Sequence, residues 1–149
     1  PLKIKVWSEV DSVVKSEAVF ASNTSMFTIT DLAEATQRKD RFIGMHLFSP
    51  ANIMKLVEVT RTEDTRDDVV ELIVALSTAM RKIPIVLKDV PGDTGFVGNR
   101  IMGAVRREAM KIVEEGVATK DDVNTAMTQG FRWPTGPFPD GPNARSGWR

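Results

Sequence analysis

Apolar positions in the first ninety residues recur with the periods of helices and strands. Segment 3–15 repeats its apolar residues every three or four positions, which predicts an amphipathic helix. Its apolar face would contain Ile4, Trp7, Val10 and Val14. Four short apolar runs are typical of strands: 18–22, 41–48, 55–61 and 83–89. We expect the first and the last of these runs to form buried strands.

Two more helices are expected between these strands. Asp31 is followed three residues later by Glu34, which is close to the capping box of a helix start. Thr65 opens a longer apolar repeat. Its buried stripe would contain Val69, Ile73, Leu76 and Met80. The resulting order of elements predicts an α/β sheet whose last part turns antiparallel.

The pattern changes after the segment "VPGDTG", residues 90–95, where we expect a domain boundary. Residues 96–115 predict a long helix that ends before Gly116. One face of this helix would carry Val97, Ile101, Val105, Ala109, Ile112 and Val113. Thr119, with Asp122 three residues later, predicts the start of another helix that runs to about Gly130. The second part of the chain is therefore expected to be helical.

The composition of the chain argues against several kinds of binding partner and site. The 149 residues carry 20 basic and 20 acidic side chains, which argues against nucleic acid or a membrane surface held by bulk charge. The absence of cysteine excludes disulfides, thiolate metal sites and a cysteine nucleophile, and it fits a reducing compartment such as the cytoplasm. No apolar run approaches the ~20 residues of a membrane span.

A polar cluster follows the first predicted strand, in the segment "FASNTSMFTIT". Its members are Ser22, Asn23, Thr24 and Ser25. Such side chains bond to their own backbone and favour a turn. They also suit a binding site, because open α/β sheets bind ligands at the carboxyl ends of their strands. The segment alone leaves both interpretations open.

His46 is the only histidine of the chain. If 41–48 and 55–61 pair as a hairpin about the loop "SPANIM", His46 lies opposite Glu58 and projects from the same face. A carboxylate beside an imidazole orients the ring, as in general acid–base catalysis. A cross-strand polar pair without a catalytic role would look the same, and a register slip of one residue would separate the two side chains.

Asn99 is a second candidate, because it falls in the first turn of the helix predicted after "PGDTG". Its carboxamide would either serve a site or simply cap the helix or face the turn. The glycines around Asn99 do not form the GxGxxG loop of a dinucleotide fold.

Two long segments carry a resemblance to a known family. They are "ASNTSMFTITDLAEATQRKDRFIGMHLFSPANIMKLVEV" and "KDVPGDTGFVGNRIMGAVRREAMKIVEEGVATKDDVNTAM". Both resemble the 3-hydroxyacyl-CoA dehydrogenases, and the likeness extends over about residues 1–138. The resemblance implies the C-terminal half of a Rossmann-type NAD-binding domain at 1–90. It also implies the start of the all-helical C-terminal domain at 91–138. Residues 139–149 leave the family pattern and are expected to be a disordered tail.

The resemblance also implies roles for individual residues. His46 in "GMHLFSP" matches the catalytic histidine of the family, and Glu58 in "MKLVEV" matches its carboxylate partner. Ser25 would bind the oxygen of the substrate, and Asn99 in "GFVGNR" would help to polarise it. Asn23 would lie near the cofactor.

Two weaker matches complete the implied site. Lys3 falls where the family has a lysine near the cofactor. Ser49 stands where many members have an asparagine that touches the cofactor, although some multifunctional members resemble the "FSP" form seen here.

The implied reaction is hydride transfer between the C3 carbon of a 3-hydroxyacyl-CoA and NAD, in a homodimer formed through the helical domain. The chain begins at Pro1 and lacks the glycine-rich unit of the family, so we expect a fragment that binds NAD poorly and turns over little by itself. A non-catalytic helical module, self-associating through 91–131, is the alternative. A related hydroxy-acid dehydrogenase is a third possibility, although those enzymes usually centre catalysis on a lysine.

Overall fold

The computed structural model describes residues 2–92 and 95–139, which belong to two compact units. The first unit is Pro1–Phe96 and the second is Val97–Arg149. The tail predicted for 139–149 lies outside the described residues from position 140 onward. Each unit is therefore considered by itself.

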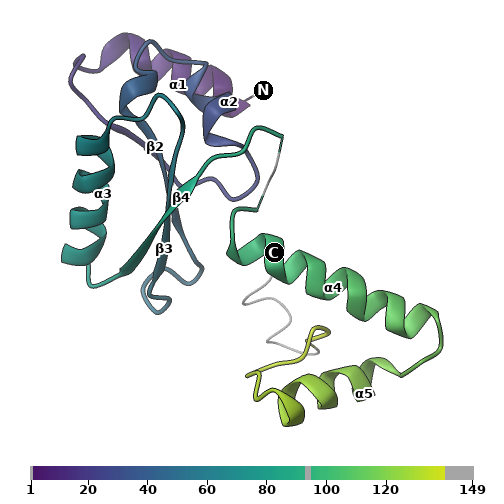
Figure 1. Cartoon of the computed structure of the whole chain (residues 1–149). Coiled ribbons are helices and arrows are strands. Elements are labelled where there is room, and N and C mark those ends of the chain that lie inside the picture. The colour runs from purple at the N-terminus through teal and green to yellow at the C-terminus, as the bar shows by residue number, and fades with distance from the viewer. Residues whose placement is uncertain (1, 93–94, 140–149) are drawn as a thin grey trace. The chain divides into compact units, whose positions relative to one another are not determined.

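A four-stranded sheet forms the centre of the first unit (Figure 1). Its strands are β1 (Phe20–Ser22), β2 (Phe42–Leu47), β3 (Leu56–Arg61) and β4 (Ile83–Lys88). They lie in the order β1-β2-β3-β4. The β1–β2 and β3–β4 pairs are parallel, whereas β2 and β3 are antiparallel. The predicted α/β class, the four strands and the antiparallel turn are confirmed.

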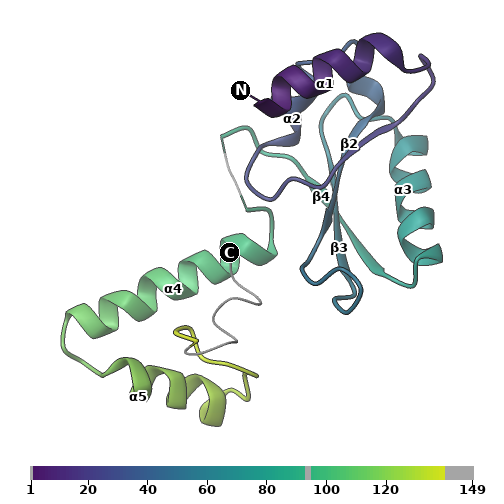
Figure 2. The same cartoon turned by 180° about the vertical axis from the view of Figure 1, so that it is seen from behind.

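Helices cover both faces of this sheet, and α2 and α3 lie on opposite sides of it (Figure 2). The helical elements of the unit are α1 (Leu2–Val13), α2 (Ile29–Ala33), the 3₁₀ turn η1 (Lys39–Arg41) and α3 (Asp67–Ala79). The side of α3 buries Ile43, Met45, Val57, Val59, Val69, Val70 and Ile73. The side of α1 and α2 buries Phe20, Ile29, Leu32, Ala33 and Phe42, with Trp7, Val10 and Val14 packed against them.

Strand alternation decides which residues face α2. Gly44 and His46 follow Phe42 at every second position and so point to the same face as Phe42. Glu58 and Thr60 lie opposite His46 and Gly44 and share this face. The candidate pair is therefore on the side of the sheet where α2 begins.

The buried face of α3 contains Val69 and Ile73 as predicted, but it departs from the predicted stripe toward the carboxyl end of the helix. Leu76 and Met80 are each 45% exposed, and Ser77 is buried instead. Ser77 tolerates burial because its hydroxyl donates a hydrogen bond of 2.7 Å to the Ile73 carbonyl. The buried face of the helix therefore continues from Ile73 to Ser77 instead of to Leu76.

Two further expectations were wrong in detail. A strand expected to be buried, β4, ends the sheet order, and each of its residues is half-buried or exposed. Helix α2 starts earlier than predicted, because the hydroxyl of Thr28 accepts a hydrogen bond from the Asp31 amide as its N-cap. Thr65 lies just before α3, and its hydroxyl donates a hydrogen bond of 2.9 Å to the Phe42 carbonyl.

The second unit contains α4 (Gly98–Glu114), α5 (Lys120–Thr125) and a π-helical turn, Ala126–Gly130. Thr119 and Asp122 form a complete capping box, and hydrogen bonds from Thr119 hold the pKa of Asp122 below its usual range. Gly116 has φ 70° and ends α4 as predicted. The expected apolar face of α4 is only partly covered, because Ala109 is buried, Val105, Ile112 and Val113 are half-buried, and Val97 and Ile101 are exposed.

Gly44 leaves no room for a side chain. A Cβ at this position would lie 2.9 Å from Ile29 Cδ1 and 3.0 Å from Thr60 Cβ. We expect Gly44→Ala to lower the free energy of unfolding by about 1–3 kcal/mol, as measured by urea denaturation.

The comparison variant is Gly103→Ala in α4, where the new Cβ would meet only Arg107 Nη1 at 3.4 Å. It should be neutral or stabilising by about 0.5–1 kcal/mol. Ile29→Val removes the nearest clashing atom, so part of the loss should be recovered in the double variant. Equal stability of Gly44→Ala and the unchanged protein would contradict the observed packing.

Arg38 closes the carboxyl end of α1. Its guanidinium forms an ion pair with Asp11 and donates to the carbonyl oxygens of Lys15 at 2.5 Å and Asp11 at 3.1 Å. Only 10% of the Arg38 side chain and 9% of the Asp11 side chain are exposed. The guanidinium also lies 4.5 Å from the ring centroid of Phe20. Arg38 therefore ties the end of α1 to the start of β1.

Asp11 makes stability depend on pH. The hydrogen bond from the Gln37 amide, together with those from Arg38, holds the pKa of Asp11 below its usual range despite the opposing effect of burial. Because the folded pKa is depressed, Asp11 stabilises the fold above its unfolded pKa and loses this effect as the pH falls through the folded pKa. We expect Asp11→Asn to lower the melting temperature at neutral pH and to flatten its fall in acid. If the melting temperatures of Asp11→Asn and of the unchanged protein fall in parallel as the pH is lowered, this role of Asp11 is contradicted.

Candidate active site

His46 and Glu58 form the pair that the sequence predicts. The register places His46 directly opposite Glu58, and His46 Nδ1 lies 2.8 Å from Glu58 Oε2. The two residues are 4% and 0% exposed. Because a carboxylate only accepts hydrogen bonds, Nδ1 carries the donated proton and Nε2 is left as an acceptor. The imidazole is thus held in one tautomer and one orientation.

Ser25 bonds to the other side of the same ring. Its Oγ lies 2.9 Å from His46 Nε2, and the serine is half-buried. Since Nδ1 donates to Glu58, the Ser25 hydroxyl must be the donor to Nε2. The three side chains form a continuous relay, Ser25–His46–Glu58. The resemblance implied a role for Ser25 toward the substrate, but its direct bond to His46 was not predicted.

The loop that carries Ser25 is fixed by its neighbours. Thr24 Oγ1 accepts a hydrogen bond of 3.2 Å from the Phe27 amide, which makes a turn. Asn23 Oδ1 accepts a bond of 2.8 Å from the Leu47 amide and so ties the loop to the end of β2. The two interpretations of this polar segment are therefore compatible, because the turn itself delivers Ser25 to His46.

Aromatic rings surround the imidazole. The ring centroid of His46 lies 4.7 Å from that of Phe48 and 5.6 Å from that of Phe96. Phe96 has φ 51°, a left-handed conformation that costs about 1–2 kcal/mol for a residue with a side chain. These rings lower the local polarity, which strengthens the hydrogen bonds of the relay.

The other predicted residues occupy separate places. Lys3 Nζ lies 5.3 Å from the ring centroid of Phe27, so Lys3 is near the loop that carries Ser25. Ser49 is exposed and follows β2. Asn99 is half-buried in the first turn of α4, in the second unit. Val97, not Asn99, occupies the N-cap position of α4, so the helix-cap interpretation of Asn99 is wrong.

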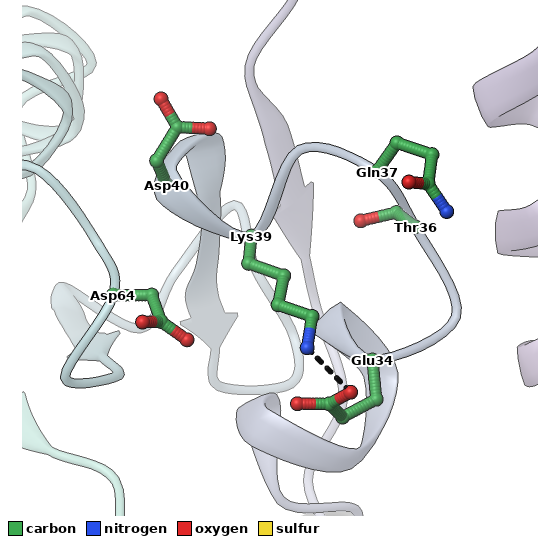
Figure 3. Close-up of a pocket in the computed structure, with 6 residues that line it drawn as sticks. All are labelled: Glu34, Thr36, Gln37, Lys39, Asp40 and Asp64. Carbon is green, nitrogen blue, oxygen red and sulfur yellow. Dashed lines mark hydrogen bonds and ion pairs between the residues drawn. The ribbon is translucent and has the colours of Figure 1, made fainter.

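A polar hollow lies at the other end of the sheet, where β2 begins and β3 has ended (Figure 3). It is lined by Glu34, Thr36, Gln37, Lys39, Asp40 and Asp64. Lys39 Nζ is 2.5 Å from Glu34 Oε2, and Asp40 lies near Arg41 and Arg66. Its charges are thus largely paired within the fold, and His46 is not among the lining residues.

Residues 2–92 and 95–139 contain neither a metal-binding cluster nor a membrane-spanning helix. No group of three or more His, Cys, Asp or Glu side chains there could hold a metal ion. None of the helices in this described part has the length and apolar character needed to cross a membrane.

Comparison with known proteins gives consistent matches over both parts of the chain. Residues 1–90 match the family "3-hydroxyacyl-CoA dehydrogenase, NAD binding domain", and residues 95–139 match "3-hydroxyacyl-CoA dehydrogenase, C-terminal domain". The human mitochondrial hydroxyacyl-coenzyme A dehydrogenase is 42% identical over 139 residues, which cover 92% of this chain and 43% of that protein. The 3-hydroxybutyryl-CoA dehydrogenase of Clostridioides difficile is 38% identical over 92% of this chain and 48% of its own length.

A solved structure shows the same fold. The crystal structure of (S)-3-hydroxybutyryl-CoA dehydrogenase from Ralstonia eutropha matches with a TM-score of 0.87 and 41% identity. The match covers 92% of this chain and 47% of that one. The chain thus spans less than half the length of these relatives.

Proposed function

The chain belongs to the 3-hydroxyacyl-CoA dehydrogenase family, and on this premise we propose that its protein interconverts 3-hydroxyacyl-CoA and 3-oxoacyl-CoA with NAD. The observation that carries the proposal is the relay from Ser25 through His46 to Glu58. A buried imidazole is suited to general base catalysis when a carboxylate fixes one nitrogen and the other is a hydrogen-bond acceptor that can take up a proton. The NAD-binding domain match supports NAD as the cofactor.

In the oxidation direction, His46 Nε2 takes the proton of the C3 hydroxyl. Glu58 stabilises the imidazolium that forms, because its carboxylate already holds Nδ1 at 2.8 Å. Ser25 turns its hydroxyl from Nε2 to the substrate oxygen and holds it, and Asn99 is proposed to donate a second hydrogen bond there. NAD, when bound, supplies the acceptor for the hydride that leaves C3.

Three residues are proposed to bind the cofactor. Asn23 uses its Oδ1 for the Leu47 amide, while its Nδ2 makes no hydrogen bond within the described residues and is available as a donor. Lys3 supplies a positive charge beside the same loop, and Ser49 supplies a hydroxyl at the end of β2. An amide donor, an ammonium and a hydroxyl fit the carboxamide and phosphate groups of NAD.

The test is NADH oxidation that depends on acetoacetyl-CoA, with binding of each ligand measured separately by calorimetry. Turnover by the protein that carries this chain would support the proposal. Binding of both ligands without turnover would contradict it, because the complete relay would then be present and idle.

A homodimer formed through the helical part is also proposed. Several apolar side chains of the second unit are exposed, including Ile101 at 57% and Val117 at 71%. Unpartnered apolar side chains of this size favour association. The same observation supports the alternative function, a non-catalytic self-association module. A stable oligomer in light scattering without nucleotide or acyl-CoA binding would favour that alternative.

The cytoplasm remains the proposed location, on the ground that the chain has no cysteine. The human, pig, mouse and rat relatives are named as mitochondrial proteins. Fractionation of the source cells, with the protein detected by antibody, tests this location directly.

A further inference from the structure

We propose that Ser25 is a nucleophile, and that the relay hydrolyses acyl thioesters without NAD. The choice of an acyl-CoA as substrate rests on the proposed function, whereas the reactivity of Ser25 rests on the relay alone. A serine becomes nucleophilic when an imidazole accepts its proton and a third group orients that imidazole. The distances of 2.9 Å from Ser25 to His46 and 2.8 Å from His46 to Glu58 meet this requirement.

The direction of the hydrogen bonds is the one that activates a serine. Glu58 accepts from Nδ1, so Nε2 has its lone pair toward Ser25 and receives the hydroxyl proton. His46 is buried and therefore held in place, while Ser25 is only half-buried. The next residue, Met26, is 64% exposed. The nucleophile is thus at the surface and its base is beneath it.

The backbone amides of the nucleophile and of the residue after it are the donors that we assign to the developing negative charge. The amides of Ser25 and Met26 donate no hydrogen bond to any acceptor within residues 2–92 and 95–139. Amide groups of this kind stabilise the oxyanion of a tetrahedral intermediate, and they require no reorganisation if already unpaired. Thr24 Oγ1 holds the Phe27 amide and thereby fixes the turn in which both residues lie.

The reaction has two balanced steps. In the first, a bond forms between Ser25 Oγ and the thioester carbon, and the carbon–sulfur bond breaks. The Oγ proton passes to His46 Nε2 and then to the leaving thiolate, which departs as free CoA. In the second, water attacks the acyl-serine, gives a proton to Nε2, and releases the carboxylic acid as that proton returns to Oγ.

An alkyl fluorophosphonate tests the nucleophile without any acyl-CoA. Attack by Ser25 Oγ forms a bond to phosphorus and expels fluoride, and mass spectrometry of peptides identifies the modified residue. We expect modification of Ser25 that is lost in Ser25→Ala and at least about 10²-fold slower in His46→Asn. Ser12→Ala is the matched control, because Ser12 is exposed and its hydroxyl donates to the Glu9 carbonyl, with no imidazole bonded to it in the described part of the chain. Ser25 of the Ser12→Ala variant should be modified as fast as Ser25 of the unchanged chain.

If His46→Asn does not fold, Ser25→Ala still serves as the test variant. Ser25 lies in a half-buried loop, so its replacement by alanine is expected to leave the fold intact. Modification of Ser25 at the rate of Ser12 would overturn the proposal, as would an unchanged rate in folded His46→Asn.

The second measurement is thiol release from acetoacetyl-CoA in the absence of NAD and NADH. Release that disappears in Ser25→Ala supports hydrolysis. If the fluorophosphonate modifies Ser25 but no thiol is released, Ser25 is a reactive serine, and the proposed hydrolysis of acyl thioesters is overturned. Failure of this assay is distinct from failure of the dehydrogenase proposal, which is measured by NADH oxidation alone.

Discussion

Replacing His46 by asparagine is expected to lower kcat/KM for acetoacetyl-CoA-dependent NADH oxidation about 10²–10⁴-fold, the usual contribution of general acid–base catalysis. Asparagine retains hydrogen bonding toward Ser25 and Glu58 but has no group that exchanges a proton near neutral pH. The side chain it replaces bonds to Glu58 at 2.8 Å and to Ser25 at 2.9 Å. The loss should appear mainly in kcat, because the proton is transferred in the transition state.

Glu58→Gln separates orientation from charge. Glutamine fills the same volume, and its oxygen can still accept from His46 Nδ1, so the ring should keep its place. The negative charge that stabilises the imidazolium is removed, and we expect a smaller loss in kcat than for His46→Asn. Circular dichroism and thermal unfolding of both variants show whether the fold persists. A folded His46→Asn variant with a rate within about tenfold of the unchanged protein would exclude His46 as the general acid–base.

The position of this pair could be predicted, because a hairpin imposes few choices. Once "SPANIM" is taken as the loop between two strands, the alternation of side chains leaves His46 opposite Glu58 or facing away from it. The resemblance to the family favours the first of these registers, and the structure has it. The bond from Ser25 to His46 could not be predicted, since it depends on how a loop leaves β1 and crosses β2.

The errors have a common physical cause. Periodicity shows which residues are apolar, but it does not show which of them meet a partner. Leu76 and Met80 have the correct spacing for a buried stripe, yet the sheet lies against the side of α3 that carries Ser77. Likewise, β4 is apolar but has a neighbouring strand on one side only in the described sheet. A hydroxyl that bonds within its own helix is compatible with burial and leaves no hydrophobic signal.

Arg38 was missed for a related reason. A charged residue in a polar segment is normally predicted to be solvated, and no spacing rule marks it as buried. In the fold it meets the carboxyl end of α1, where carbonyl groups have no helical partner. The negative end of the helix dipole, the Asp11 carboxylate and the Phe20 ring all favour a cation at this point. Burial of the arginine is thus a consequence of where α1 ends.

The second large effect is expected for stability. Arg38→Leu should lower the free energy of unfolding by about 3 kcal/mol, because it leaves the nearly buried carboxylate of Asp11 without its ion pair and the end of α1 without its donors. Urea denaturation followed by tryptophan fluorescence is a suitable measurement, since Trp7 lies 5.0 Å from Phe20, the ring beneath Arg38.

Two comparisons identify the cause of this loss. Arg66→Leu removes an ion pair with Asp68 in which both side chains are solvent-exposed. We therefore expect little change in the urea concentration at the midpoint of unfolding. The double variant Arg38→Leu/Asp11→Leu removes both charges of the nearly buried pair. It should be less destabilised than the sum of the single variants, because neither partner is then left unpaired. Additive losses in this cycle would show that Arg38 stabilises the fold through the carbonyl groups of α1 and not through Asp11.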